Sequence, residues 1–293
     1  MGDGMEEIRS IFDSAFLRKL EQLRLNTRKL MNTKGSGIRK SRSKGSSVEF
    51  SDYREYTAGD DFRRIDWNAY GRFERLFVKL FMEERQAKIN IFLDTSASMD
   101  WGTPHKGIQA KRLSAAIAYI GLSNFDSVSL FSVNHRLVSV GTSMHGKRAF
   151  RQVLDYLEPL PFEGTTALNK AVTEFNGSGG AGLSFVISDF MSLDGMQEAM
   201  KYLQYRKQDV LLCQILAPEE ISPAVRGGVR LLDRETGEAR DITVTDALLR
   251  SYDKALTHFI NDLKAFCFKR GITHMHFSSD VEIENVLTAL LGR

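Results

Sequence analysis

The chain has 293 residues, with 40 Lys and Arg against 37 Asp and Glu and a formal net charge of +3. A hydrophobic share of 42% and only five prolines exclude a disordered or fibrous protein and indicate a large α/β domain with an additional module. No signal-peptide pattern and no apolar run long enough to span a bilayer is evident, so we expect no membrane span, and the mild basic excess says little about partners.

The first 35 residues are expected to be helical. Apolar residues recur there at helical spacing: Ile8, Ile11, Phe12, Phe16 and Leu20. A loop rich in Gly and Ser follows, and it contains four basic residues: Arg39, Lys40, Arg42 and Lys44. One interpretation of this loop is a solvated flexible linker, and the other is an electrostatic dock for an acidic partner or a polyanion.

Aromatic and oppositely charged residues alternate between Phe50 and Trp67. Neighbouring side chains such as Asp60 and Asp61 rarely converge, and no His or Cys stands beside them, so ion pairs with the nearby arginines are favoured over a catalytic pair. Trp67, Tyr53 and Tyr56 are large enough to anchor a small core. We expect residues 1–84 to form an N-terminal helical and β module, and residues 85–293 to form a second domain.

From residue 76 onward, apolar runs typical of strands alternate with amphipathic helical patterns, which favours an α/β fold with a doubly wound, mostly parallel sheet. The expected strands are 76–83, 89–94, 127–133, 137–140, 183–189, 210–216 and 273–277, and the expected helices are 106–124, 148–157, 168–175, 196–205, 247–270 and 283–291. Residues 230–242 are typical of a hairpin that turns at Thr236-Gly237.

The two cysteines, Cys213 and Cys267, both lie in apolar contexts. This favours buried free thiols over a disulfide or a metal cluster. Free thiols are typical of a reducing compartment, so we expect a cytoplasmic protein.

Oxygen-bearing side chains occupy three loops that follow strands or precede helices. The loops are Asp94-Thr95-Ser96-Ala97-Ser98, Gly164-Thr-Thr-Ala-Leu168 and Ser188-Asp189. Ligand sites in open α/β sheets lie at the carboxyl ends of the strands. Carboxylates and hydroxyls are ligands that suit Mg²⁺, and the absence of His and Cys from these loops argues against zinc.

Asp94-x-Ser96-x-Ser98, the threonine of Gly164-Thr-Thr-Ala-Leu168, and Asp189 resemble the metal-ion-dependent adhesion site of von Willebrand factor A domains. The resemblance covers roughly residues 89 to 290 and implies a Rossmann-type fold. It implies that Asp94, Ser96, Ser98, Thr166 and Asp189 hold Mg²⁺, with Mn²⁺ or Ca²⁺ as alternatives. One coordination position would then accept an acidic side chain of a protein partner. Thr166 matches the family better than Thr165, which remains an alternative.

The upstream segment Phe50-Ser-Asp-Tyr-Arg-Glu-Tyr-x-x-Gly-Asp-Asp-x-Arg-x-Ile-Asp-Trp67 resembles the signature of the bacterial family called domain of unknown function 58. The basic stretch from Arg39 to Ser47 and Val78-Lys79 also fit that family. In it, such a module precedes a von Willebrand A-like domain. The resemblance implies a MoxR-type AAA+ ATPase, or a client of that ATPase, as the partner.

These observations predict a non-enzymatic interaction protein. A metal-dependent phosphoester hydrolase is the alternative, but Ser96 stands where a haloacid-dehalogenase-like phosphatase needs its general acid, and no general base or second metal site is evident. Polyanion binding through the loop from Arg39 to Lys44 is a third reading, although we do not expect nucleic acid as the partner.

Overall fold

The computed structural model describes residues 11–22, 48–83, 86–176, 180–191 and 195–291. The chain divides into two compact units, a larger one of Met1–Gly35 with Ala87–Arg293 and a smaller one of Ser36–Gln86. The basic loop from Arg39 to Lys44 lies outside the described residues. Among the described residues, no helix has both the length and the apolar character needed to cross a membrane.

A six-stranded sheet forms the centre of the larger unit, with strand order β10-β7-β6-β3-β4-β5. The strands are β3 (Lys88–Asp94), β4 (Ser127–Val133), β5 (Leu137–Met144), β6 (Gly182–Ser188), β7 (Gln208–Leu216) and β10 (Thr273–Ser278). Neighbouring strands are parallel, except that β5 pairs antiparallel with β4 at one edge. The predicted α/β fold with a doubly wound, mostly parallel sheet is confirmed.

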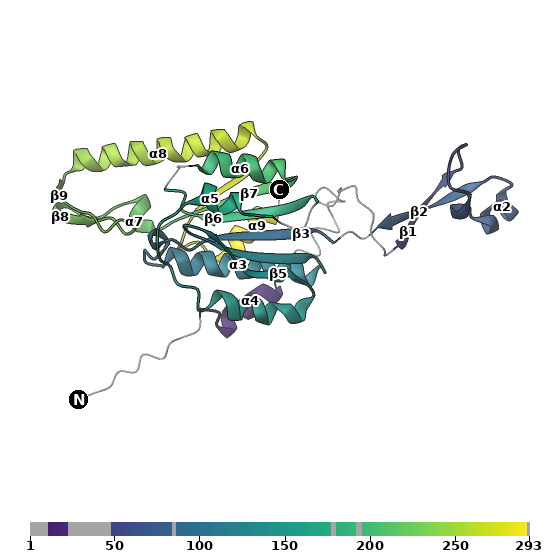
Figure 1. Cartoon of the computed structure of the whole chain (residues 1–293), viewed down its shortest axis with the longest axis horizontal. Coiled ribbons are helices and arrows are strands. Elements are labelled where there is room, and N and C mark those ends of the chain that lie inside the picture. The colour runs from purple at the N-terminus through teal and green to yellow at the C-terminus, as the bar shows by residue number, and fades with distance from the viewer. Residues whose placement is uncertain (1–10, 23–47, 84–85, 177–179, 192–194, 292–293) are drawn as a thin grey trace, which may run out of the picture. The chain divides into compact units, whose positions relative to one another are not determined.

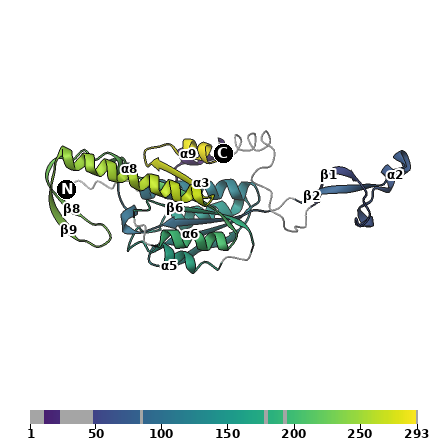
Figure 2. The same ribbon diagram turned by 90° about the horizontal axis from the view of Figure 1, so that it is seen from above.

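Helices cover both faces of this sheet (Figures 1 and 2). One face packs against α3 (Lys106–Ser123), α4 (Phe150–Leu157) and α9 (Ile283–Leu291), and the other packs against α5 (Leu168–Thr173), α6 (Met196–Tyr205) and α8 (Asp246–Lys269). Each face of the sheet has its own hydrophobic core. Alternate residues of β3 belong to one core or the other, because successive side chains of a strand point to opposite faces. Ile91 and Leu93 enter the first core and Phe92 the second, all of them fully buried.

Strands that follow β3 in the chain are added first on one side of it and then on the other. From β3 the chain passes through α3 to β4 on one side, and it later returns to form β6 on the other side. The carboxyl ends of β3 and β6 therefore flank the topological switch point, where α/β proteins place their ligand sites. Asp94 ends β3, and Asp189 directly follows β6.

A hairpin of β8 (Gly227–Leu232) and β9 (Ala239–Val244) stands apart from the central sheet, after the short helix α7 (Pro218–Ile221). Its strands pair antiparallel, and the turn contains Gly237 at a φ of 73°. The predicted hairpin is therefore confirmed. Figure 1 shows it beyond the carboxyl ends of the parallel strands.

The expected module of residues 1–84 divides between the two units. Residues 14–22 are helical, and Phe12, Phe16 and Leu20 are buried in the same core as α3. Their apolar face is covered by the larger unit, so this helix belongs to that unit and not with the residues that follow it in the chain. The boundaries thus differ from the expected division at residue 84.

The smaller unit consists of the antiparallel pair β1 (Val48–Glu55) and β2 (Phe77–Glu83), the 3₁₀ helix η1 (Phe62–Arg64) and α2 (Trp67–Phe73). The expected strand at residues 76–83 is present, but it pairs with β1 in a sheet of its own.

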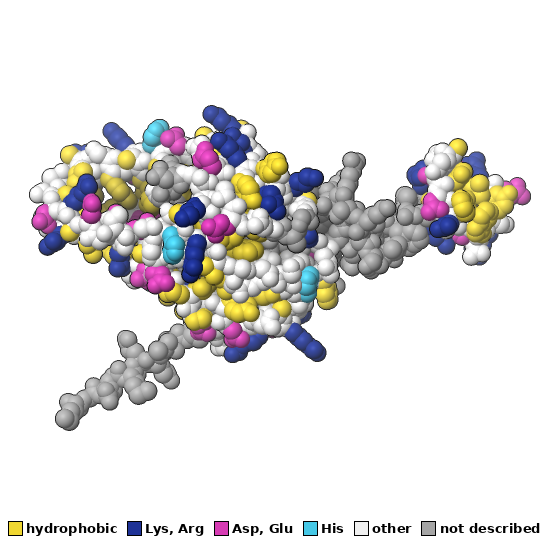
Figure 3. Space-filling model, viewed as in Figure 1, with side chains coloured by type: hydrophobic (Ala, Val, Ile, Leu, Met, Phe, Trp, Pro, Cys, Tyr) yellow, Lys and Arg dark blue, Asp and Glu magenta, His cyan; other side chains and the backbone are white. Residues whose placement is uncertain are grey.

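Ion pairs in the smaller unit form part of the expected network. The Arg54 guanidinium lies 2.7 Å from Asp60, and Asp66 lies 3.2 Å from the Lys79 ammonium. The role predicted for Trp67 is wrong, because its side chain is 64% exposed. Figure 3 shows hydrophobic side chains gathered on one face of this unit.

Both cysteines are buried free thiols, as predicted. Cys213 lies on β7, the second strand from one edge of the sheet, and Cys267 lies on the inner face of α8. Burial raises the pKa of each thiol to about 12, so the thiolate form is strongly disfavoured at neutral pH.

Candidate metal centre

The loop after β3 folds around the carboxylate of Asp94. Asp94 and Ser96 are both buried, and the Ser96 backbone N–H donates to Asp94 Oδ1 at 2.9 Å. The 3₁₀ helix η2 (Ala97–Met99) follows, and it brings the Ser98 hydroxyl within 3.0 Å of the Ser96 hydroxyl. One carboxylate and two hydroxyls therefore lie together at the end of one strand.

Backbone hydrogen bonds fasten the loop that precedes α5 to the loop after β3. The Ala97 N–H donates to the Gly164 carbonyl at 3.0 Å, and the Glu163 N–H donates to the Thr95 carbonyl at 2.8 Å. These reciprocal bonds place the predicted threonine loop beside the Asp94 loop. Thr166 is partly buried there, whereas Thr165 is exposed.

The loop after β6 meets the same carboxylate from the other side. The Ser188 hydroxyl donates to Asp94 Oδ2 at 2.5 Å and accepts a hydrogen bond from the Phe190 N–H at 3.0 Å. Asp189 is buried, and its Oδ1 accepts a hydrogen bond from the Met191 N–H at 3.0 Å. The three loops predicted from separate parts of the sequence therefore converge at one edge of the sheet.

A buried lysine at the start of α3 completes this arrangement. The Lys106 ammonium lies 2.7 Å from Asp189 Oδ2 and 2.6 Å from Glu220 Oε1, and the lysine side chain is only 1% exposed. Glu220 comes from α7, so this cation joins two elements that follow different strands. Sequence reasoning missed Lys106 and Glu220, because a lysine at a helix start is ordinarily a solvated residue and no local pattern marks this one.

The electrostatics of the site favour a cation. Burial and the neighbouring charge of Asp189 raise the pKa of Asp94 to about 6, although the hydrogen bonds from Ser188 and Ser96 oppose the shift. The carboxylates of Asp94 and Asp189 thus repel each other in a buried environment, and a divalent cation between the loops would reduce that repulsion.

The donor types at this site fit Mg²⁺. Among the described residues, no three His, Cys, Asp or Glu side chains come together as a metal-binding group. An ion here would therefore be held by two carboxylates, by hydroxyls and by water. Mg²⁺ is commonly bound through one or two carboxylates while it retains several waters, so the residues present suit it.

An acidic residue of the chain itself contacts Thr166. Glu235 lies in the turn of the β8–β9 hairpin, and its Oε1 accepts a hydrogen bond from the Thr166 hydroxyl at 2.9 Å. Its Oε2 lies 3.3 Å from the Thr166 N–H. Sequence reasoning found the hairpin but missed this contact, because the two residues are 69 positions apart.

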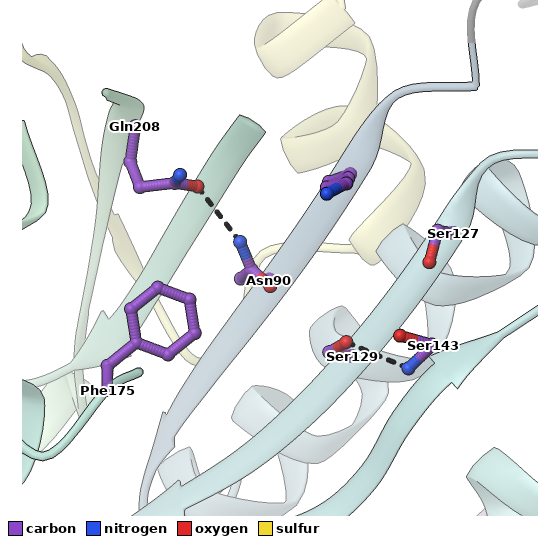
Figure 4. A pocket seen from close by; sticks show the side chains of 7 residues that line it. Asn90, Ser127, Ser129, Ser143, Phe175 and Gln208 are labelled. Atoms are coloured by element: carbon purple, nitrogen blue, oxygen red, sulfur yellow. Dashed lines mark hydrogen bonds between the residues drawn. The ribbon is translucent and has the colours of Figure 1, made fainter. Parts of the chain in front are cut away.

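A polar cavity of about 20 Å³ lies elsewhere, at the amino ends of the strands. Figure 4 shows Asn90 and Gln208 pointing toward each other beside it, with Asn90 Nδ2 donating to Gln208 Oε1 at 2.9 Å. Its volume suits about one water molecule. Because Asp94 lies at the opposite end of β3, this cavity belongs to the packing of the sheet and not to the candidate site.

Fold and site together define an α/β protein with a doubly wound sheet and an oxygen-rich candidate metal centre at its switch point. The chain belongs to the family described as "Protein of unknown function DUF58", whose model matches residues 52–258. This family was expected from the segment between Phe50 and Trp67, and the match confirms it.

The chain is also similar to individual proteins, at low sequence identity. Uncharacterized proteins of Mycobacterium tuberculosis and Mycobacterium bovis are each 23% identical over 217 residues, which covers 72% of this chain and 68% of theirs. BatB of Bacteroides thetaiotaomicron is 16% identical with a TM-score of 0.44, over 70% of this chain and 97% of that one. A von Willebrand factor type A protein of Catenulispora acidiphila is 13% identical with a TM-score of 0.36, over 48% and 36% of the two chains.

Proposed function

We propose that this protein is a non-enzymatic interaction protein that holds Mg²⁺ through Asp94, Ser96, Ser98, Thr166 and Asp189 and uses the ion to bind an acidic side chain of a partner. The observation that carries the proposal is the convergence of the three loops, fastened by the hydrogen bonds from Ala97 to Gly164 and from Ser188 to Asp94. Mn²⁺ and Ca²⁺ are the alternative ions.

Each of the five proposed ligands, and two residues beside them, has a definite role in this proposal. Asp94 and Asp189 supply the negative charge, and the hydroxyls of Ser96, Ser98 and Thr166 supply neutral oxygens. Ser188 and Lys106 orient the two carboxylates by hydrogen bonding, as outer-shell groups do at metal sites. When bound, the ion would offer a coordination position to a partner's carboxylate, which offsets the cost of desolvating that group.

On the basis of the family resemblance, the proposed partner is a MoxR-type AAA+ ATPase or a client of that ATPase. Capture of such an ATPase by the full chain is therefore the test, carried out without nucleotide because the ATPase has its own requirement for Mg²⁺. We expect capture in Mg²⁺, loss of capture in EDTA, and loss of capture by an Asp94→Ala variant in Mg²⁺.

Asp155→Asn is the matched control. Asp155 is an exposed aspartate on α4 whose carboxylate pairs with Arg151, so its replacement removes the same charge outside the three loops. Capture that is indifferent both to EDTA and to Asp94→Ala in a folded protein would defeat the proposal. Metal-dependent turnover of a generic phosphoester that disappears with Asp94→Ala would instead identify a hydrolase.

A further inference from the structure

The acidic residue that touches the candidate metal centre belongs to this chain. Glu235 accepts hydrogen bonds from the hydroxyl and the backbone N–H of Thr166, at 2.9 and 3.3 Å. Thr166 is one of the proposed ligands. A carboxylate of this chain thus already contacts one of the groups proposed to bind the ion.

The hairpin turn is built to present this one residue inward. Asp233 Oδ1 accepts hydrogen bonds from the N–H groups of Glu235 and Thr236, at 2.8 and 2.9 Å, and Gly237 allows the chain to reverse. Between Leu231 and Arg240, Glu235 is half-buried and its neighbours are exposed. The geometry of the turn therefore fixes which side chain faces Thr166.

The same hairpin forms a two-stranded sheet of its own, and its residues are mostly exposed, so no pairing with the central sheet holds it in place. Besides Glu235, Arg234 of the tip contacts the segment after η2: it donates to the Asp100 carbonyl at 2.9 Å and lies 5.3 Å from the centre of the Trp101 ring. Displacing the tip breaks no strand pairing of the central sheet. The free energy needed to displace the tip includes the loss of the contacts made by Glu235 and Arg234.

We propose that Glu235 is an internal acidic ligand of the candidate metal site and that the β8–β9 hairpin regulates access to it. This inference rests on the proposed function. Glu235 and a partner's Asp or Glu have the same chemistry, so they compete for the same position. The partner's apparent affinity is then reduced by the fraction of molecules in which Glu235 occupies the site.

Chemical rescue by acetate tests this mechanism directly. Mn²⁺ affinity of the full chain is measured by calorimetry in sodium acetate and in sodium chloride of equal ionic strength. Glu235→Ala removes the carboxylate, and we expect it to weaken Mn²⁺ binding at least about tenfold, since the loss of even an outer-shell partner of a metal ligand has an effect of that size. Acetate should restore most of that loss in Glu235→Ala and change nothing in the wild type, whose own carboxylate holds the position.

Glu238→Ala is the matched control, because Glu238 follows the same turn, is 70% exposed in its side chain and pairs with Arg240 at 3.6 Å. It should behave as the wild type in both salts. Mn²⁺ affinity of Glu235→Ala equal to that of the wild type, a loss that acetate does not restore, or an equal acetate response in the wild type would each overturn the inference. A wild type that binds no Mn²⁺ would instead defeat the proposed function, so the two failures are distinguishable.

Discussion

The ammonium of Lys106 lies 2.7 Å from the carboxylate of Asp189, and both side chains are almost completely buried. A second carboxylate, that of Glu220, lies 2.6 Å from the same ammonium. The charge of Asp189 is thus held by the protein from one side, while Asp94 approaches it from another and has its own pKa raised by that charge. The site therefore contains one cation of the protein, the Lys106 ammonium, and the charge repulsion between Asp94 and Asp189 favours the binding of a second cation.

Lys106→Met should therefore destabilise the protein strongly when no metal is added. The substitution keeps the side-chain volume but leaves Asp189 and Glu220 without their cation, and breaking a buried pair in this way costs about 3–5 kcal/mol. Urea unfolding in EDTA measures the loss. Mg²⁺ should stabilise Lys106→Met more than the wild type, because it would neutralise Asp189 in place of the lysine.

The double variant Lys106→Met/Asp189→Asn provides the control for that measurement. Removing the charge of Asp189 as well should recover part of the lost stability, since only Glu220, whose side chain is 19% exposed, is then left without its cation. If the double variant were as unstable as Lys106→Met, the loss would not come from the unpaired charge of Asp189.

Asp94→Asn should separate metal binding from folding. Mg²⁺ at about a hundred times its dissociation constant should raise the free energy of unfolding of the wild type by about 2.7 kcal/mol. The asparagine variant should show no such gain in thermal unfolding experiments. In EDTA it should be at least as stable as the wild type, because it no longer places a buried charge beside Asp189. An unchanged Mg²⁺ response in Asp94→Asn would contradict the assignment of Asp94 as a ligand.

The parts of this molecule that could be predicted from sequence are those that local patterns determine. The run from Ile89 to Leu93 predicts a buried strand, and the oxygen-bearing residues that follow it predict a ligand loop, because both depend on neighbours in the chain. The alternation of such runs with helical patterns then fixes the doubly wound sheet.

The contacts that sequence reasoning missed depend on tertiary placement. Lys106 and Asp189 are separated by 83 positions, and Thr166 and Glu235 by 69, with no spacing rule to connect them. The sequence groups the N-terminal helix with the module that follows it in the chain, because the apolar face of the helix does not indicate which surface covers it. The exposure of Trp67 follows from the small size of its unit, which cannot bury every aromatic side chain.

Gly107 permits the close approach of α3 to the metal loop, so Gly107→Ala should be destabilising although it replaces a helical glycine. An added Cβ would lie 2.5 Å from the Phe162 ring and 2.7 Å from the carbonyl oxygen of Met99. Met99 ends η2, which carries Ser98, so the clash falls on the candidate site. Overpacking of this kind costs about 1–3 kcal/mol. Weaker Mn²⁺ binding should accompany the loss of stability in urea.

Gly71→Ala is the control for this steric argument. Gly71 also lies inside a helix, α2, but nothing lies within 4 Å of the position that its Cβ would occupy. There the usual preference of helices for alanine should apply and add up to about 1 kcal/mol. Equal effects of the two substitutions would show that the contacts with Phe162 and Met99 are unimportant.

Acid should weaken the smaller unit through Asp66. This carboxylate accepts hydrogen bonds from the Tyr53 hydroxyl at 2.8 Å and from the Asn68 N–H at 2.9 Å, and the Lys79 ammonium lies 3.2 Å away. The hydrogen bond from Tyr53, followed by that from Lys79, lowers the pKa of Asp66 to about 2. An unfolded aspartate titrates near pH 3.9, so the stabilisation is complete above about pH 5 and is lost progressively as the pH falls toward 2.

The fluorescence of Trp67, which directly follows Asp66, reports on this unit once the other tryptophan is replaced by Trp101→Phe. In that background, the urea midpoint of the Trp67 signal should fall between about pH 5 and pH 3, because the folded unit binds fewer protons than the unfolded one. Asp66→Asn should lower the midpoint at pH 5 and flatten its pH dependence. The remaining dependence should come from Asp60, whose pKa is also lowered to about 2 by hydrogen bonds from the Thr57 N–H and Arg54. A slope unchanged by Asp66→Asn would show that its hydrogen bonds to Tyr53 and Lys79 do not hold the unit together.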